Sequence, residues 1–209
     1  NIQKFVIYLV SCNLSEIFIV TILGFLAPAS TLLPLQILFL NMVTDVFPAL
    51  ALGVGKGDKS VMDRPPRDPK KKIITQKNWL AIGVYAVLMT ASVILAVFYC
   101  RYTMVTDSRM ENNIAFFTLA FAQLFHVFNM SAADSRLFIN DVTKNKFVWL
   151  ALFICFGILA IVFFLPQMRL VLNLGALPLR VWLVSILAGL LLLILVQGFK
   201  IIRGKKKKI

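Results

Sequence analysis

Two short stretches of this 209-residue chain place carboxylates, amides and hydroxyls inside apolar runs. Asn13 and Glu16 lie three residues apart in the first run, so they would share a helix face. In the second run, Asn41, Thr44 and Asp45 have the spacing i, i+3 and i+4, which also places them on one face. A central Asp in a membrane helix costs about 2.5 to 3.5 kcal/mol, so these residues indicate a functional site.

The two polar faces are expected at the same depth. The midpoints of the runs fall near residues 15 and 42, so Glu16 and Asp45 lie within about four residues, or about 6 Å, of the midplane. Pro48 has no N–H, so the carbonyl group of Thr44 loses its helical partner. We expect the second helix to be broken near Pro48, with the Thr44 carbonyl available as a ligand.

The candidate ligands are all oxygen atoms, from carboxylates, amides, a hydroxyl and the main chain. They suit a hard cation such as Ca²⁺, with six to eight ligands at about 2.3 to 2.6 Å, better than zinc or copper. The alternative is that these polar residues only join helices, at about 0.6 kcal/mol per contact. That alternative does not explain two facing acids, because like charges repel unless a proton or cation lies between them.

The elements that must position these residues are membrane helices. Hydrophobic residues make up 60% of the chain and the mean hydropathy is +0.87, far above an ordinary soluble domain. The apolar runs are continuous and lack the alternation of barrel strands. We expect an all-α membrane protein, a six-transmembrane-helix bundle forming a single domain over residues 1–209. The expected spans are residues 5–25, 32–52, 79–100, 114–130, 147–165 and 181–202.

The basic residues predict the topology. The net charge is +13, but 18 of the 22 Lys and Arg residues fall at the termini and in alternate connections, so they indicate sidedness rather than nucleic-acid binding. The positive-inside rule places both termini and the loop 53–78 in the cytoplasm. The basic tail 203–209 is expected to face lipid headgroups. The expected location is an integral, multi-pass position in the bilayer, in the plasma membrane if the source is prokaryotic.

Two connections differ in character. The connection 27–33 is short and uncharged, which forces the first two helices into an antiparallel hairpin. In the long loop, Arg64-Pro65-Pro66-Arg67 predicts a rigid extended turn that presents both arginines to the cytoplasm, because consecutive prolines forbid helix. A plain polar connector is the alternative.

The fourth helix carries a second polar stripe, formed by Gln123, His126 and Asn129. His126, the single histidine, has two interpretations, a proton relay or a residue hydrogen-bonded within the bundle, and the second is the more usual. The three cysteines lack metal-site spacing and are interpreted as small buried hydrophobic residues. They are Cys12, Cys100 and Cys155.

These residues carry a family resemblance. The stretch from Leu33 to Asp45 with Pro48-Ala49, and then Met62 to Arg67, closely resembles the C-terminal membrane region of P-type cation ATPases. Within that family it looks most like calcium pumps of the sarcoplasmic-reticulum kind. The segment 1–16 resembles the fifth transmembrane helix, and the six runs match helices five to ten. The resemblance covers essentially the whole chain, strongly over residues 1–75.

The resemblance implies a set of cation ligands: Asn13, Glu16, Asn41, Thr44 and Asp45. Calcium pumps read Asn-x-x-Thr-Asp in the middle helix, whereas sodium pumps usually have Asp in the first position. Two positions depart from the pattern. Val46 replaces the usual Gly, and Gln123 stands where two-site pumps have an acidic ligand. We therefore expect one well-formed Ca²⁺ site, with Gln123 as a possible residue of a second.

The resemblance also implies an ATP-driven cycle through an aspartyl-phosphate, with Mg²⁺ and ATP bound by the parent protein. The phosphorylation, nucleotide and actuator domains and the first four helices are expected to be missing partners of this piece, which alone would have no ATPase activity. The segment Arg64-Pro65-Pro66-Arg67 would couple the phosphorylation domain to the site. The alternatives are a pump for Na⁺ or another monovalent cation, and a non-transporting membrane scaffold.

Overall fold

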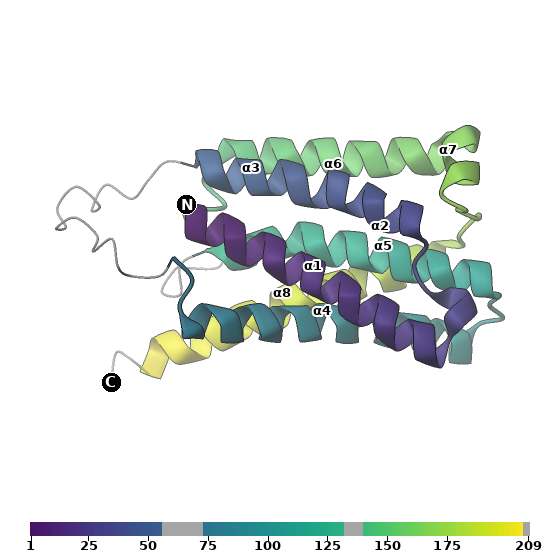
Figure 1. Ribbon diagram of the computed structural model, residues 1–209, viewed down its shortest axis with the longest axis horizontal. Coiled ribbons are helices and arrows are strands. Elements are labelled where there is room, and N and C mark those ends of the chain that lie inside the picture. Colours follow the sequence, from purple (N-terminus) through teal and green to yellow (C-terminus); the bar gives the residue numbers. More distant parts are fainter. Residues whose placement is uncertain (56–72, 132–139, 207–209) are drawn as a thin grey trace, which may run out of the picture.

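The protein is a bundle of helices. A computed structural model describes residues 1–55, 73–131 and 140–206, and all regular structure within these ranges is helical (Figure 1). Six helices are long and apolar enough to cross a membrane, by their length and composition. The expected all-α bundle of six spans is therefore confirmed, and the chain is an integral, multi-pass membrane protein. The loop segment Arg64-Pro65-Pro66-Arg67 lies outside the described residues.

The helices follow the expected order with shifted ends. They are α1 (Ile2–Leu26), the 3₁₀ turn η1 (Pro28–Ser30), α2 (Pro34–Leu40), the π-helical turn η2 (Asn41–Asp45), α3 (Val46–Val54), α4 (Gln76–Thr103), α5 (Ser108–His126), the 3₁₀ turn η4 (Val127–Met130), α6 (Lys146–Phe164), α7 (Pro166–Val171) and α8 (Leu179–Lys206). The second span thus consists of α2, η2 and α3 in continuation.

Local capping explains the main differences from the expected ends. The fourth span starts at Ser108 rather than near residue 114, because Asp107 Oδ1 accepts the amide of Met110 at 2.7 Å as an N-cap. The polar first turns of α5 were too hydrophilic to be recognised as part of the span. The short helix α7 was not expected; it begins with Pro166 at its first position, where a proline costs no hydrogen bond.

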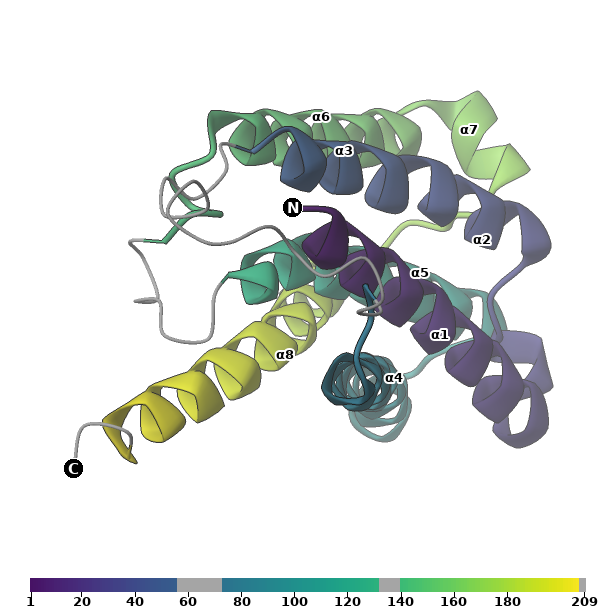
Figure 2. The same ribbon diagram turned by 60° about the vertical axis from the view of Figure 1, so that its left-hand side comes forward.

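The helices form three layers (Figures 1 and 2). The second span and α6 make one layer, α1 and α5 the middle layer, and α4 and α8 the third. The N-terminus and the C-terminal end of α8 lie at the same end, which we call the terminal end, and the opposite end carries α7 (Figure 1). The antiparallel hairpin of the first two spans is confirmed, whereas the cytoplasmic position of the termini stays a prediction.

The middle helix α5 is the centre of the bundle. Its span is 89% buried, against 28% to 44% for the other five. It packs against α4 and α8, while α1 packs against α4 and α3, and α3 against α6. The polar side chains of α5 from Glu111 to His126 are therefore buried and face protein rather than lipid.

Buried polar contacts fix the α7 end of the bundle. Glu111 is 5% exposed and accepts from Arg101 Nε at 2.8 Å, and from the hydroxyls of Thr106 and Ser30. These contacts join the first hairpin to the start of α5. The guanidinium supplies the countercharge that a buried carboxylate requires.

A second contact at this end joins two amides. Gln36 Nε2 donates to Asn112 Oδ1 at 2.7 Å, and Asn112 Nδ2 returns a bond to Gln36 Oε1 at 3.0 Å. Gln36 also donates to the carbonyl of Leu172 at 3.0 Å, and Asn112 to that of Thr31 at 2.6 Å. The pair thus fixes the start of α2 against α5 and the connection after α7.

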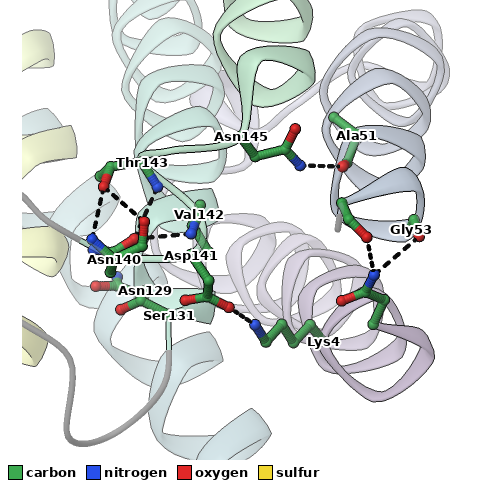
Figure 3. Close-up of polar contacts among 12 residues, drawn as sticks. Lys4, Ala51, Gly53, Asn129, Ser131, Asn140, Asp141, Val142, Thr143 and Asn145 are labelled. Atoms are coloured by element: carbon green, nitrogen blue, oxygen red, sulfur yellow. Dashed lines mark hydrogen bonds and ion pairs between the residues drawn. The ribbon is translucent and has the colours of Figure 1, made fainter. Parts of the chain in front are cut away.

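At the terminal end, side chains satisfy the last carbonyl groups of α3 (Figure 3). Asn145 donates to the carbonyl of Ala51 at 2.8 Å, and Asn1 to that of Gly53 at 3.3 Å. Lys4 and Asp141 form an ion pair between α1 and the turn before α6. Because helix ends leave carbonyl groups without intrahelical partners, these contacts anchor the second span to both neighbours.

Close packing of α8 on α5 depends on Gly189. A Cβ atom at this position would lie 2.8 Å from Phe121 Cβ and 3.0 Å from the backbone nitrogen of Ala122. Backbone atoms cannot move aside as a flexible side chain does. The two helices therefore have to separate if any side chain is added here.

We predict that Gly189→Ala lowers the free energy of unfolding by about 1–3 kcal/mol through overpacking. Thermal unfolding in detergent measures the effect. Gly198→Ala on the same helix is the matched control, because its Cβ would meet nothing within 4 Å. Equal midpoints for the two variants would contradict the prediction.

Candidate cation site

Two acids from different helices are buried in the interior of the bundle. Glu16 of α1 is 4% exposed and Asp45, at the end of η2, is 5% exposed. Among the described residues no cluster of three or more His, Cys, Asp and Glu side chains occurs, so any cation site here must combine these acids with neutral oxygen donors. The surroundings of the two acids supply such donors.

Neutral amides hold both carboxylates. Asn13 Nδ2 donates to Asp45 Oδ2 at 2.9 Å. Gln123 Nε2 donates to Glu16 Oε1 at 2.9 Å. The Asn41 amide, oriented with its nitrogen toward Glu16, lies 3.0 Å from both carboxylate oxygens. The structure thus brings together the acids and amides that the sequence predicted to converge.

The acids differ in how fully they are satisfied. Both oxygens of Glu16 have a donor, whereas Asp45 Oδ1 is buried and makes no hydrogen bond within the described residues. A buried carboxylate oxygen without a donor is costly. Asn13, which holds the other oxygen of Asp45, is exposed at the side of the bundle. Asp45 Oδ1 is therefore the oxygen of this pair that is free to accept a ligand.

The irregularity expected near Pro48 is a π-helical turn rather than a gap. The five residues from Asn41 to Asp45 form η2, one turn before Pro48, and α3 continues from Val46. In a π-turn each backbone hydrogen bond joins residues five apart instead of four, which widens the helix locally. Such turns are frequent at functional sites. Valine at position 46 in place of Gly does not prevent this change of geometry.

Side chains from two neighbouring helices pair with carbonyl groups of the π-turn. Tyr8 of α1 donates its hydroxyl to the carbonyl of Thr44 at 2.8 Å, and Cys155 of α6 donates its thiol to that of Val43 at 3.2 Å. The carbonyl freed by Pro48 thus has a partner in this arrangement. Neither partner was identified from the sequence, although Tyr8 lies two helical turns before Glu16 and hence on the same face.

Gln123 lies within the cluster instead of in a separate one. Besides its bond to Glu16, its Oε1 accepts from Thr44 Oγ1 at 2.7 Å, so one amide bridges α1 and η2 from the side of α5. Thr44 Oγ1 is also 2.8 Å from the carbonyl of Leu40. The residue expected at a possible second site therefore positions the acid and the hydroxyl of the first.

His126 forms a separate polar group next to the cluster. Its Nε2 lies 3.0 Å from Ser11 Oγ, and its Nδ1 3.3 Å from the Asn129 amide nitrogen. The ring is fully buried and packs edge-on against Tyr85 at 4.7 Å and in a stack with Tyr8 at 5.8 Å. The structure thus agrees with a histidine hydrogen-bonded within the bundle.

The residues brought together are all oxygen and amide donors. Hard cations prefer such ligands, whereas zinc and copper favour Cys and His. The two nearby thiols do not change this conclusion, because Cys12 is a buried free cysteine and Cys155 donates to a carbonyl. The chemistry that the arrangement supports is reversible binding of a hard cation in the interior of the bundle.

Known proteins have sequences similar to this chain. Residues 29–202 match the family model described as "Cation transporting ATPase, C-terminus". The chain is 31% identical over 169 residues to a calcium-transporting ATPase of Bacillus subtilis (strain 168), an alignment that covers 81% of this chain and 19% of that protein. It is 30% identical over 198 residues to calcium-transporting ATPase 1 of Bacillus cereus (strain ATCC 10987 / NRS 248), covering 87% and 22%.

The chain spans about a fifth of the length of these relatives. The family match covers five of the six spans completely and begins in the connection after α1. It therefore includes η2 and Gln123, whereas Tyr8, Asn13 and Glu16 of α1 lie before its first residue. On these grounds the chain belongs to the family of cation-transporting ATPase C-terminal regions, the membrane part of P-type ATPases.

Proposed function

We propose that this chain is the ion-binding and translocation module of an ATP-driven P-type pump that transports Ca²⁺. The relatives are named calcium-transporting ATPases, which supports both the reaction and the ion. ATP and Mg²⁺ would act in the whole protein, through the aspartyl-phosphate cycle of the family. In a prokaryote the membrane concerned would be the plasma membrane.

One observation carries the proposal: within residues 1–55, 73–131 and 140–206, the two acids of the site have no basic partner. Glu16 and Asp45 are held by neutral amides, whereas Glu111, equally buried, is paired with Arg101. Amides can solvate a carboxylate but cannot neutralise it. The charge of the first two acids must therefore be balanced by a proton or a bound cation, and the cation can be exchanged.

The proposed ligands divide into two groups. Glu16 and Asp45 supply the charge, with the unsatisfied Oδ1 of Asp45 directed to the ion. Asn13 and Asn41 supply amide oxygens once their side chains turn from donating to accepting. Two negative charges match one divalent cation, and the neutral Gln123 adds none. This charge balance supports a single Ca²⁺ ion at the site.

Thr44 has a different role in the arrangement observed. The Thr44 carbonyl accepts a hydrogen bond from the Tyr8 hydroxyl. The Thr44 hydroxyl is shared between the carbonyl of Leu40 and Oε1 of Gln123. Both oxygens are thus engaged within the protein. We propose that the Thr44 carbonyl binds the ion only after the Tyr8 hydroxyl turns away, so that Tyr8 holds this ligand in reserve.

The ion selectivity of the intact protein tests the function directly. We expect Ca²⁺ to stimulate its ATP hydrolysis and Na⁺ and K⁺ not to, because an all-oxygen site with two acids favours a hard divalent cation. Measuring the ATPase rate across Ca²⁺, Mn²⁺, Na⁺ and K⁺ decides the question. Stimulation by Na⁺ or K⁺ alone would contradict a calcium pump.

Removing either charge of the site should abolish ion dependence. We predict that Asp45→Asn and Glu16→Gln in the intact protein each eliminate Ca²⁺-dependent phosphorylation by ATP, because one carboxylate cannot balance a divalent cation. Glu111→Gln is the matched control, since it removes an equally buried acid away from the site. If Asp45→Asn keeps normal Ca²⁺ dependence, Asp45 is not a ligand.

The reserve role of Tyr8 predicts an effect on stability. Tyr8→Phe leaves the Thr44 carbonyl without its donor, at a cost of about 1–3 kcal/mol in the absence of Ca²⁺. Bound Ca²⁺ can use that carbonyl, so the rise in unfolding temperature on adding Ca²⁺ should be larger than in the wild type.

The control for this measurement is Tyr85→Phe. Tyr85 also contacts the His126 ring, but its hydroxyl makes no hydrogen bond within the described residues. The Ca²⁺-induced rise should be unchanged in this variant. An equal rise in Tyr8→Phe and the wild type would show that the Tyr8 hydroxyl only stabilises the fold.

A further inference from the structure

An apolar groove lies between α6 and α8, away from the cation site. Its volume is about 320 Å³, and α5 contributes one residue to its lining. Five of the eight lining side chains are aromatic: Phe121, Phe156, Phe163, Phe164 and Trp182. The other three are aliphatic, so the indole N–H of Trp182 is the single polar side-chain group among the lining residues and the groove offers little to hold water.

The groove forms because α6 packs mainly against the second span and not closely against α8. α6 lies against α3 and η2, which leaves its other side facing α5 and α8. The rings of Phe163 and Trp182 meet edge to face at 4.9 Å across this space, and Phe164 at its edge is 76% exposed. In a membrane protein such a space is in contact with lipid. An apolar chain is the occupant that its walls favour.

Basic side chains lie at one end of the groove. The guanidinium of Arg169 in α7 is 5.5 Å from the centre of the Phe163 ring, in a cation–π contact. Arg180 is exposed at the start of α8, two residues before Trp182. Neither arginine forms an ion pair within the described residues, and the sequence from residue 146 onward contains no acidic residue.

The combination indicates the chemistry of a ligand. We infer that this groove binds an anionic phospholipid, with an acyl chain against the aromatic walls and the phosphate on Arg169, while Arg180 adds a second positive charge at the start of α8. A guanidinium binds phosphate with two parallel hydrogen bonds. Arg169 is held over the groove wall, so the charge lies where a headgroup would be when the chain enters the groove.

The size of the groove is that of a small-ligand site. Its volume of about 320 Å³ is within the range of such sites, about 300–1,000 Å³. A slender acyl chain is therefore the occupant that fits.

Photo-crosslinking tests the assignment in the intact protein. Benzoylphenylalanine replaces Phe164 at the groove edge, and in a separate variant replaces Phe25 on α1. Both are exposed phenylalanines, 76% and 85%, near the ends of helices that finish at the α7 end. The protein is placed in vesicles of equal amounts of phosphatidylglycerol and phosphatidylcholine with identical chains. Mass spectrometry of the labelled peptide then gives the ratio of the two lipid adducts.

We expect the phosphatidylglycerol adduct to exceed the phosphatidylcholine adduct about fivefold at position 164, because one basic residue near an anionic headgroup contributes about that factor. The ratio at position 25 should be near one. Arg169→Gln should lower the ratio at position 164 toward one and leave position 25 unchanged.

Two results would overturn the inference. One is a ratio near one at position 164 with Arg169 present, and the other is an adduct to a polypeptide in place of lipid. Native mass spectrometry of the intact protein without the photoprobe gives a second reading. Retained phosphatidylglycerol should then decrease in Arg169→Gln, whereas equal retention with and without Arg169 would contradict the site.

Discussion

A single missing hydrogen-bond donor determines how three helices meet in this protein. Pro48 cannot donate to the carbonyl of Thr44, and the helix before it widens into the π-turn η2. Lipid offers no donor to a freed carbonyl, so neighbouring helices must supply one. Tyr8 of α1 and Cys155 of α6 donate to successive carbonyls of the turn. The irregular turn is therefore tolerated only because α1 and α6 lie on either side of it, and the same contact places Glu16 next to Asp45.

The bundle contains buried acids of two kinds. Their hydrogen-bond partners distinguish an acid that stabilises the fold from acids that can bind an exchangeable ion. Glu111 has a guanidinium and two hydroxyls, which neutralise and solvate it permanently at the α7 end. In the described part of the chain, the partners of Glu16 and Asp45 are amides, which leave their charge in place. A fixed countercharge such as Arg101 would compete with any incoming cation. Its absence at the central acids is what makes an exchangeable ion physically reasonable there, and the fixed pair at the end holds the first hairpin in register.

The sequence was sufficient for the positions of the acids but not for their partners. Hydropathy predicted six spans, which the structure confirms. Helical rise predicted that Glu16 and Asp45 lie at one depth, and the structure joins their two helices through the Asn13–Asp45 and Asn41–Glu16 contacts. These predictions depend only on the local chain and the thickness of a membrane. Hydrogen bonds between helices depend on rotation and packing, which a single sequence does not specify. The donors to the π-turn, Tyr8 and Cys155, were therefore not identified from the sequence, and neither were the bonds of Gln123 to Glu16 and Thr44.

The polarity of α5 contains a signal that could have predicted the contacts of Gln123. Its span has the lowest mean hydropathy of the six, 1.3 against 1.9 to 2.9, and it is the most buried, at 89%. In soluble proteins the most buried segments are the most hydrophobic, whereas here the most buried span is the least hydrophobic. The reason is that lipid solvates apolar side chains, so that polar ones must be solvated by protein. The most hydrophobic span, that of α6, is only 33% buried and borders the aromatic groove. The least hydrophobic span of such a bundle must lie at its centre, so its mid-membrane polar residue must face the other intramembrane polar groups. That reasoning alone places Gln123 between Glu16 and Thr44.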